Sequence, residues 1–274
     1  MNPWSEIIRI ALMEDIGRGD VTTNGVVPLG EETEAKIIAK EAMVVCGLPV
    51  MVEVFRQVDS RVRMMPVVAD GDGVMPGNTI AQLRGPARAI LTGERVALNF
   101  LQNLSGVASI TRQFVEKIAG TDAQIVDTRK TTPGLRGLQK YAVRIGGGSN
   151  HREGLDDGVL IKENHIMIAG GVTEAVKRMR QVASHLLRIE VECETLDQVQ
   201  EAMKAGAHVL LLDNMELETL QKAVDMAKGR CLLEASGNIS LENVRQVAET
   251  GVDLISVGKI THSSGSKDLS LLFK

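Results

Sequence analysis

The spacing of apolar residues gives the first part of the chain a mixed pattern of helices and strands. Apolar positions recur at helical spacing over residues 4–13 and 48–58, and they alternate with polar positions over 34–41 and 61–68. The first pattern predicts amphipathic helices and the second predicts half-buried strands. Turn-forming residues at 17–25 predict a loop. This part therefore predicts a small α+β domain that ends near residue 85.

A long helical pattern follows from residue 86 to about residue 119. Its apolar positions keep helical spacing, and Gly106 lies within the run. Because glycine is about 1 kcal/mol less favourable than alanine inside a helix, the pattern predicts two helices with a break at Gly106.

After residue 120 the chain alternates between short apolar runs and amphipathic helical segments. The six apolar runs are residues 123–127, 157–162, 187–192, 207–213, 230–236 and 252–258. This alternation is typical of parallel βαβ units, and a seventh strand is predicted within 140–148. No GxGxxG motif joins a strand to a helix here, so a dinucleotide-binding sheet is disfavoured. The strand count fits an incomplete β/α barrel at least as well as a doubly wound sheet.

Composition narrows the classes of function. The 31 basic and 35 acidic residues give a net charge of −4, which favours neither nucleic acid nor an anionic membrane as a partner. No run of 18 apolar residues predicts a membrane span, and charged residues come too early for a signal peptide. Cys46, Cys193 and Cys231 form no CxxC motif. They predict a reduced, cytoplasmic protein without disulfides or structural zinc.

Each predicted barrel strand ends at a polar, charged or glycine-rich group. In chain order these groups are Thr128, Arg129 and Lys130, then Lys162, Glu192, Asp213, Ser236–Asn238 and Gly258. One such residue is as often structural as functional. However, β/α barrels assemble their active sites from the carboxyl ends of the strands, and six successive examples predict one polar cavity. It would have a cationic side (Arg129, Lys130, Lys162) and an anionic side (Glu192, Asp213).

Residues 129–165 add further positive charge, because this stretch contains seven Lys/Arg and two His but only four Asp/Glu. Three glycines at 146–148 precede His151 and Arg152, and they let the backbone approach a ligand closely. Arginine forks suit carboxylates and phosphates. The pattern predicts a small substrate with several negative charges.

The anionic side predicts Mg²⁺, because two carboxylates beside a polyanion need a bridging cation or sugar hydroxyls. The turns at 236–238 and 257–259 follow the last two strands, where barrels often bind phosphate. Together these features favour phosphoribosyl transfer over hydride or acyl transfer.

The block DTRKTTPGLRGLQKYAVRIGGGSNHREGLDDGVLIKENHI at 127–166 closely resembles the central signature of the quinolinate phosphoribosyltransferase family. Further likeness lies at residues 14–23, 93–109, 189–198, 210–214, 233–240 and 255–263. The resemblance implies an α/β protein, with an N-terminal α/β sandwich domain and a C-terminal incomplete β/α barrel. It also implies a homodimer or a multiple of one. The implied reaction converts quinolinate and phosphoribosyl pyrophosphate to nicotinate mononucleotide, carbon dioxide and pyrophosphate with Mg²⁺.

We expect the sandwich domain over 1–110 and the catalytic barrel over 111–274, with the extreme C-terminus packing back on the first domain. By the resemblance, the residues around the two quinolinate carboxylates are Arg129, His151, Arg152 and Lys162. Phosphate contacts come from Lys130, Ser236, Gly237, Asn238, Val257, Gly258 and Lys259, and Thr128 also binds substrate. Glu192 and Asp213 meet the ribose hydroxyls and Mg²⁺, and Arg95 reaches across the dimer interface. The residues expected to carry the chemistry are Lys130, Lys162, Glu192 and Asp213.

Ile16 and Glu163 depart from the family, which often has proline and aspartate there, but neither is a proposed ligand contact. Two alternatives stay open. In the first, Lys162 is the Schiff-base nucleophile of an aldolase-type barrel. In the second, the chain is a non-catalytic relative associated with molybdenum transport.

Overall fold

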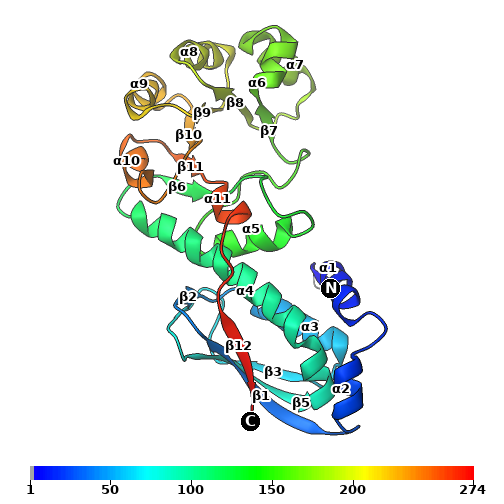
Figure 1. Cartoon of the computed structure of the whole chain (residues 1–274). Coiled ribbons are helices and arrows are strands. Elements are labelled where there is room, and N and C mark those ends of the chain that lie inside the picture. Colours follow the sequence, from blue (N-terminus) through cyan, green and yellow to red (C-terminus); the bar gives the residue numbers. More distant parts are fainter. Residues whose placement is uncertain (1–2) are drawn as a thin grey trace. The chain divides into compact units, whose positions relative to one another are not determined.

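The computed structural model describes residues 3–274, which form two compact units (Figure 1). The first unit holds the chain up to Arg112 together with residues 132–147 and 261–274. The second holds residues 113–131 and 148–260. The units are therefore not two consecutive stretches of chain, because two later segments pack with the first.

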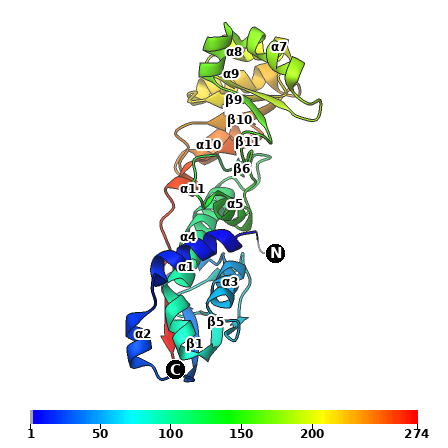
Figure 2. The same ribbon diagram turned by 90° about the vertical axis from the view of Figure 1, so that its right-hand side faces the viewer.

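The first unit is built on a four-stranded antiparallel sheet with the order β12-β1-β5-β3. Its strands are β1 (Glu32–Ala39), β3 (Arg63–Pro66), β5 (Thr79–Pro86) and β12 (Leu269–Phe273), beside a small ladder of β2 (Met43–Val44) and β4 (Gly73–Val74). Its helices are α1 (Ser5–Ile16), α2 (Val21–Val26), α3 (Leu48–Val58), most of α4 (Ala87–Lys117) and α5 (Arg136–Ile145). Helix α1 packs beside α3 (Figure 2). The last strand of the chain, β12, pairs with β1 at one edge of the sheet.

Two local predictions in this unit are wrong. The sequence predicts a loop over residues 17–25, but residues 21–25 lie in the short helix α2. The Asp20 carboxylate caps this helix by accepting the amide hydrogen of Thr23 at 2.9 Å. Residues 140–148, expected as a seventh strand, lie largely in α5. The buried Leu138, Ala142 and Val143 recur at helical spacing there. Short apolar runs fit either period, and here packing selects the helix.

The predicted break at Gly106 is also wrong, because α4 runs without interruption from Ala87 to Lys117. A Cβ atom placed on Gly106 would lie 2.0 Å from the carbonyl oxygen of Gly265. The segment before β12 runs directly along this helix, as the hydrogen bond from the Lys267 amide to the Gln102 carbonyl also shows (3.0 Å). Gly106 therefore makes room for a neighbouring backbone.

The second unit contains a six-stranded parallel sheet with the order β6-β11-β10-β9-β8-β7. All six predicted strands are present, as β6 (Gln124–Val126), β7 (Val159–Ile161), β8 (Ile189–Cys193), β9 (Val209–Asp213), β10 (Leu232–Ser236) and β11 (Leu254–Ser256). The connecting helices are α6 (Glu163–Ala169), α7 (Val172–Val182), α8 (Leu196–Ala205), α9 (Leu217–Ala227), α10 (Val244–Glu249) and the start of α11 (Lys259–His262). Helices α7, α8 and α9 follow one another around the outside of the sheet (Figures 1 and 2).

The first strand, β6, pairs with the last, β11, whereas no ladder joins β6 to β7 within residues 3–274. A single parallel bridge between Val126 and Ser149 places the glycine-rich segment beside β6 at this opening. The prediction of an incomplete β/α barrel is confirmed. None of the described helices is long and apolar enough to cross a membrane.

Gly106→Ala should destabilise the protein by about 1–3 kcal/mol, because the added methyl group meets the Gly265 carbonyl and cannot be accommodated without backbone movement. The free energy of unfolding from denaturant titration measures this. Gly25→Ala is the matched control, since Gly25 also lies in a helix but has no atom within 4 Å of its Cβ position. Equal stability of Gly106→Ala and the wild type would contradict the proposed close approach.

Candidate active site

A cavity of about 220 Å³ lies at the carboxyl ends of the barrel strands in the second unit. The predicted residues that line it are Thr128, Arg129, Lys130, His151, Arg152, Lys162, Glu192, Asp213 and Ser236. They come from the ends of five different strands and from the segment beside β6. The parallel sheet thus brings residues 108 positions apart in sequence into one wall, as the strand-end pattern predicted.

The other predicted residues do not line this cavity. Gly237 and Asn238 border an adjacent hollow of about 280 Å³, next to Ser236. Val257, Gly258 and Lys259 follow β11 and lead into α11. Arg95 is exposed on α4 in the first unit.

The cationic side, predicted from Arg129, Lys130 and Lys162, also includes Arg152 in the structure. Burial lowers the pKa of Arg152, and the charge of Arg129 lowers that pKa further. The Arg152 guanidinium also donates to the Gly158 carbonyl at 3.1 Å, which holds it in place. Two guanidinium groups that repel each other in a half-buried cavity are stabilised by a bound anion.

Lys162 joins the two sides of the cavity. Its ammonium nitrogen lies 3.5 Å from a Glu192 carboxylate oxygen, and its side chain is half exposed whereas that of Glu192 is 13% exposed. The Lys162 amide donates to Nδ1 of His165 at 2.9 Å, so the start of α6 fixes the lysine's main chain. The ammonium group of Lys162 therefore contacts Glu192 on one side and stays half exposed.

Asn214, which sequence reasoning missed, orients the other acid. Its amide donates to a carboxylate oxygen of Asp213 at 2.7 Å and accepts from the Asn238 amide at 3.1 Å. Asn214 and Asn238 both take left-handed φ values, 54° and 52°, a region that asparagine tolerates better than most residues. One side chain therefore links the carboxylate of Asp213 to the Ser236–Asn238 turn.

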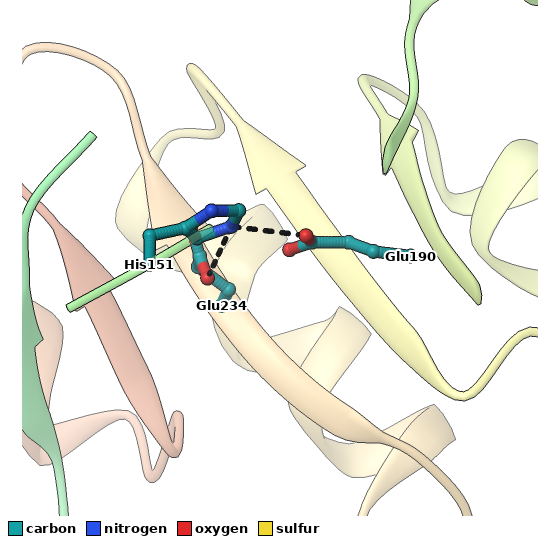
Figure 3. A group of neighbouring side chains, drawn as sticks. All are labelled: His151, Glu190 and Glu234. Carbon is teal, nitrogen blue, oxygen red and sulfur yellow. Dashed lines mark hydrogen bonds and ion pairs between the residues drawn. The ribbon is translucent and has the colours of Figure 1, made fainter. Parts of the chain in front are cut away.

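At the floor of the cavity, His151 faces two buried carboxylates that the sequence analysis also missed (Figure 3). Its Nε2 lies 3.0 Å from Glu190 and 3.6 Å from Glu234, whose side chains are 9% and 1% exposed. The signal was present in the sequence. Glu190 precedes Glu192, and Glu234 precedes Ser236, by two residues on a strand, so each pair shares one face.

The charges in this cluster depend on one another. Burial lowers the pKa of His151, but the hydrogen bond to Glu190 and the charges of both glutamates outweigh burial and raise it. Burial raises the pKa of Glu234 well above the usual carboxyl range, and repulsion by Glu190 adds to this effect. The cluster therefore tends to keep protons that free side chains would release.

Both parts of the chain are similar to one family of known proteins. Residues 107–272 match the family description "Quinolinate phosphoribosyl transferase, C-terminal domain", and residues 20–105 match its N-terminal domain. A probable nicotinate-nucleotide pyrophosphorylase (carboxylating) of Bacillus subtilis is 46% identical over 260 residues, covering 94% of this chain and 89% of its own.

Two solved structures are also similar over nearly the whole chain. The nicotinate-nucleotide pyrophosphorylase from Ehrlichia chaffeensis is 44% identical, with a TM-score of 0.96 and 100% of both chains covered. The enzyme of the same name from Francisella tularensis is 42% identical, with a TM-score of 0.95 and 98% and 95% of the two chains covered.

Glu234→Gln should gain stability relative to the wild type as pH rises. Because the pKa of Glu234 is raised in the folded state, the folded protein holds a proton that the unfolded chain releases. Unfolding free energy then falls with rising pH from the unfolded carboxyl pKa up to the raised one, by at most about 1.4 kcal/mol per pH unit. Glutamine removes this contribution.

The measurement is the free energy of unfolding at several pH values between about 5 and 8. Glu216→Gln, at an exposed position without a side-chain cap hydrogen bond, is the control. A constant difference between Glu234→Gln and the wild type over this range would contradict the raised pKa.

Proposed function

This chain belongs to the quinolinate phosphoribosyltransferase family, and we propose that it transfers the phosphoribosyl group of phosphoribosyl pyrophosphate to quinolinate. The products are nicotinate mononucleotide, carbon dioxide and pyrophosphate, and the reaction belongs to NAD biosynthesis. One observation supports the roles below more than any other: Arg129, Arg152 and Lys162 line the same cavity as Glu192 and Asp213. Neither the aldolase nor the non-catalytic alternative accounts for that arrangement together with the family match.

Quinolinate is an aromatic ring with two neighbouring carboxylates, and we assign it to the cationic side. Arg129, Arg152 and Lys162 also border a larger hollow of about 730 Å³ whose other lining is mostly apolar, including Leu160, Ile161 and Met179. Guanidinium and ammonium groups would bind the carboxylates while apolar walls accept the ring. His151 completes the set that the family resemblance assigns to this substrate.

Phosphoribosyl pyrophosphate would occupy the opposite side. Lys130 is assigned to its phosphates, and the Thr128 hydroxyl, which accepts the Lys130 amide hydrogen at 3.0 Å, shapes that turn. The phosphate-binding turns are Ser236–Asn238 and Val257–Lys259. Glu192 and Asp213 would bind the ribose hydroxyls.

The donors present at Glu192 and Asp213 fit Mg²⁺, which prefers carboxylate oxygens and keeps water and phosphate oxygens as further ligands. Asn214 holds one oxygen of Asp213 and leaves the carboxylate facing the cavity. When bound, Mg²⁺ neutralises charge on the pyrophosphate.

The chemistry follows from these charges. As the bond to pyrophosphate loosens, the ribosyl carbon becomes cation-like, and the quinolinate nitrogen attacks it. The quaternary nitrogen then stabilises the electron pair left on C2 when the 2-carboxylate departs as carbon dioxide, and a proton replaces it. Arg129, Arg152 and Lys162 orient the dicarboxylate, and holding the two reactants in line can supply up to roughly 7–11 kcal/mol.

We further propose a homodimer in which Arg95 of one chain completes the site of the other, as the family resemblance implies. Arg95 is exposed on α4, so its guanidinium is available to a second chain. A cytoplasmic location is proposed from the three free cysteines, two of them buried.

Incubation with phosphoribosyl pyrophosphate and Mg²⁺ should turn over quinolinate but very little nicotinate. Nicotinate lacks the 2-carboxylate, so one cation of the site would stay desolvated without a partner, and nothing could leave as carbon dioxide. Phthalate, which has both carboxylates but no ring nitrogen, should inhibit competitively. Mass detection of nicotinate mononucleotide gives the readout. The proposal would be refuted if well-folded protein formed no nicotinate mononucleotide from quinolinate, or if it turned over nicotinate as fast as quinolinate.

Arg95→Ala and Lys162→Ala should each be nearly inactive as homodimers, because each removes a charge that contacts substrate. Mixing the two variants should restore activity, since a heterodimer contains one site with both residues intact. Subunit exchange is verified by native mass spectrometry of differently tagged chains. Confirmed exchange without recovered activity would argue for a site built within one chain.

A further inference from the structure

The hydrogen bonds of His151 determine which ring nitrogen carries its proton. The amide of Arg152 donates to Nδ1 of His151 at 2.8 Å, so Nδ1 is an acceptor and carries no hydrogen. The proton then resides on Nε2, which points at Glu190 at 3.0 Å and Glu234 at 3.6 Å (Figure 3). Both ring nitrogens are engaged within the protein.

A bound cation is the other way to stabilise two buried carboxylates, and the three ligand atoms lie within 4.8 Å of one another. One oxygen of each glutamate is buried without a hydrogen-bond partner among the described residues. However, a histidine that binds a metal through Nε2 normally donates its Nδ1 hydrogen to an acceptor. Here Nδ1 faces the Arg152 amide hydrogen, so the geometry favours a proton on Nε2 over a metal ion.

The main chain around His151 is fixed by a third buried carboxylate. Asp127, which is 0% exposed, accepts the amide hydrogen of His151 at 2.9 Å and the side-chain amide of Asn150. The backbone of residues 150–152 is therefore held from β6 through Asp127, and from β8 and β10 through the imidazole. These contacts fix the main chain from which the Arg152 guanidinium reaches the cavity.

We infer that Glu190 and Glu234 are positioning residues, which lock His151 as its Nε2–H tautomer so that Nδ1 holds the main chain of Arg152 at the substrate cavity. His151 then borders the substrate cavity, but its two ring nitrogens contact protein groups, and its contribution to binding the dicarboxylate is made through Arg152. The inference rests on the proposed function for its kinetic consequence, but its structural part does not depend on any activity.

Glu190→Gln provides the main test, because a glutamine amide can donate to Nε2 and so permit the other tautomer, which repels the Arg152 amide. The KM for quinolinate should rise about tenfold, the effect of weakening one charge-assisted contact, while kcat changes much less. The KM for phosphoribosyl pyrophosphate should stay unchanged, which a general loss of structure would not allow. Glu234→Gln serves as the second variant, and Glu116→Gln, which changes an exposed acid on α4, is the control.

The tautomer itself is read from nitrogen NMR of protein labelled with ¹⁵N-histidine, with the His151 signals identified by their absence in His151→Phe. The wild type should show a protonated Nε2 and an unprotonated Nδ1, and Glu190→Gln should shift this balance. An Nδ1–H tautomer in the wild type would overturn the inference. So would paramagnetic loss of the His151 signals on adding Mn²⁺ alone, if Glu234→Gln abolished that loss. Absence of turnover in the wild type would refute the proposed function and leave the NMR result to decide this inference.

Discussion

Three carboxylates buried inside the barrel unit constrain the rest of the site. Counted over whole residues, Asp127, Glu190 and Glu234 are 0%, 7% and 1% exposed. A buried carboxylate without partners is costly in free energy. Segment 149–152 supplies partners to all three through the His151 ring, its amide and Asn150. The same segment bridges β6 at the opening of the barrel. The hydrogen bonds that pair the three buried acids therefore also hold Arg152 at the cavity.

The buried acids lie next to the cations of the cavity. The charge of Glu190 stabilises the charged form of the Arg152 guanidinium, whereas burial and the charge of Arg129 destabilise it. Arg129 and Arg152 can therefore lie close together without a ligand, and a bound dianion would neutralise their remaining positive charge. Groups fixed in advance need no reorganisation when charge changes during reaction, which is the usual source of electrostatic catalysis.

The sequence predicts the parallel sheet well, because each strand is a short apolar run of distinct composition between amphipathic helices. The ends of the strands are equally visible, so seven residues of the cavity lining could be named from them, and the glycine-rich segment added His151 and Arg152. The role of Gly106 could not be predicted from its sequence neighbours, because glycine is needed there to make room for the backbone of Gly265, which is far away in the sequence. Asn214 was missed for a similar reason: it follows Asp213 directly, but its other partner, Asn238, is 24 residues away in the turn after β10 and meets it only in the fold.

Glu190 and Glu234 show how depth along a strand separates two kinds of residue on one face. In a β/α barrel, alternate strands contribute to the same interior layer, and β8 and β10 are alternate strands with β9 between them. Two residues further along, the same faces carry Glu192 and Ser236 at the cavity wall. In the inner layer the side chains of Glu190 and Glu234 are only 9% and 1% exposed, and both contact the His151 ring. Glu234 borders the floor of the cavity, but its carboxyl group is directed to His151. Charge in the inner layer therefore acts on the cavity mainly through His151.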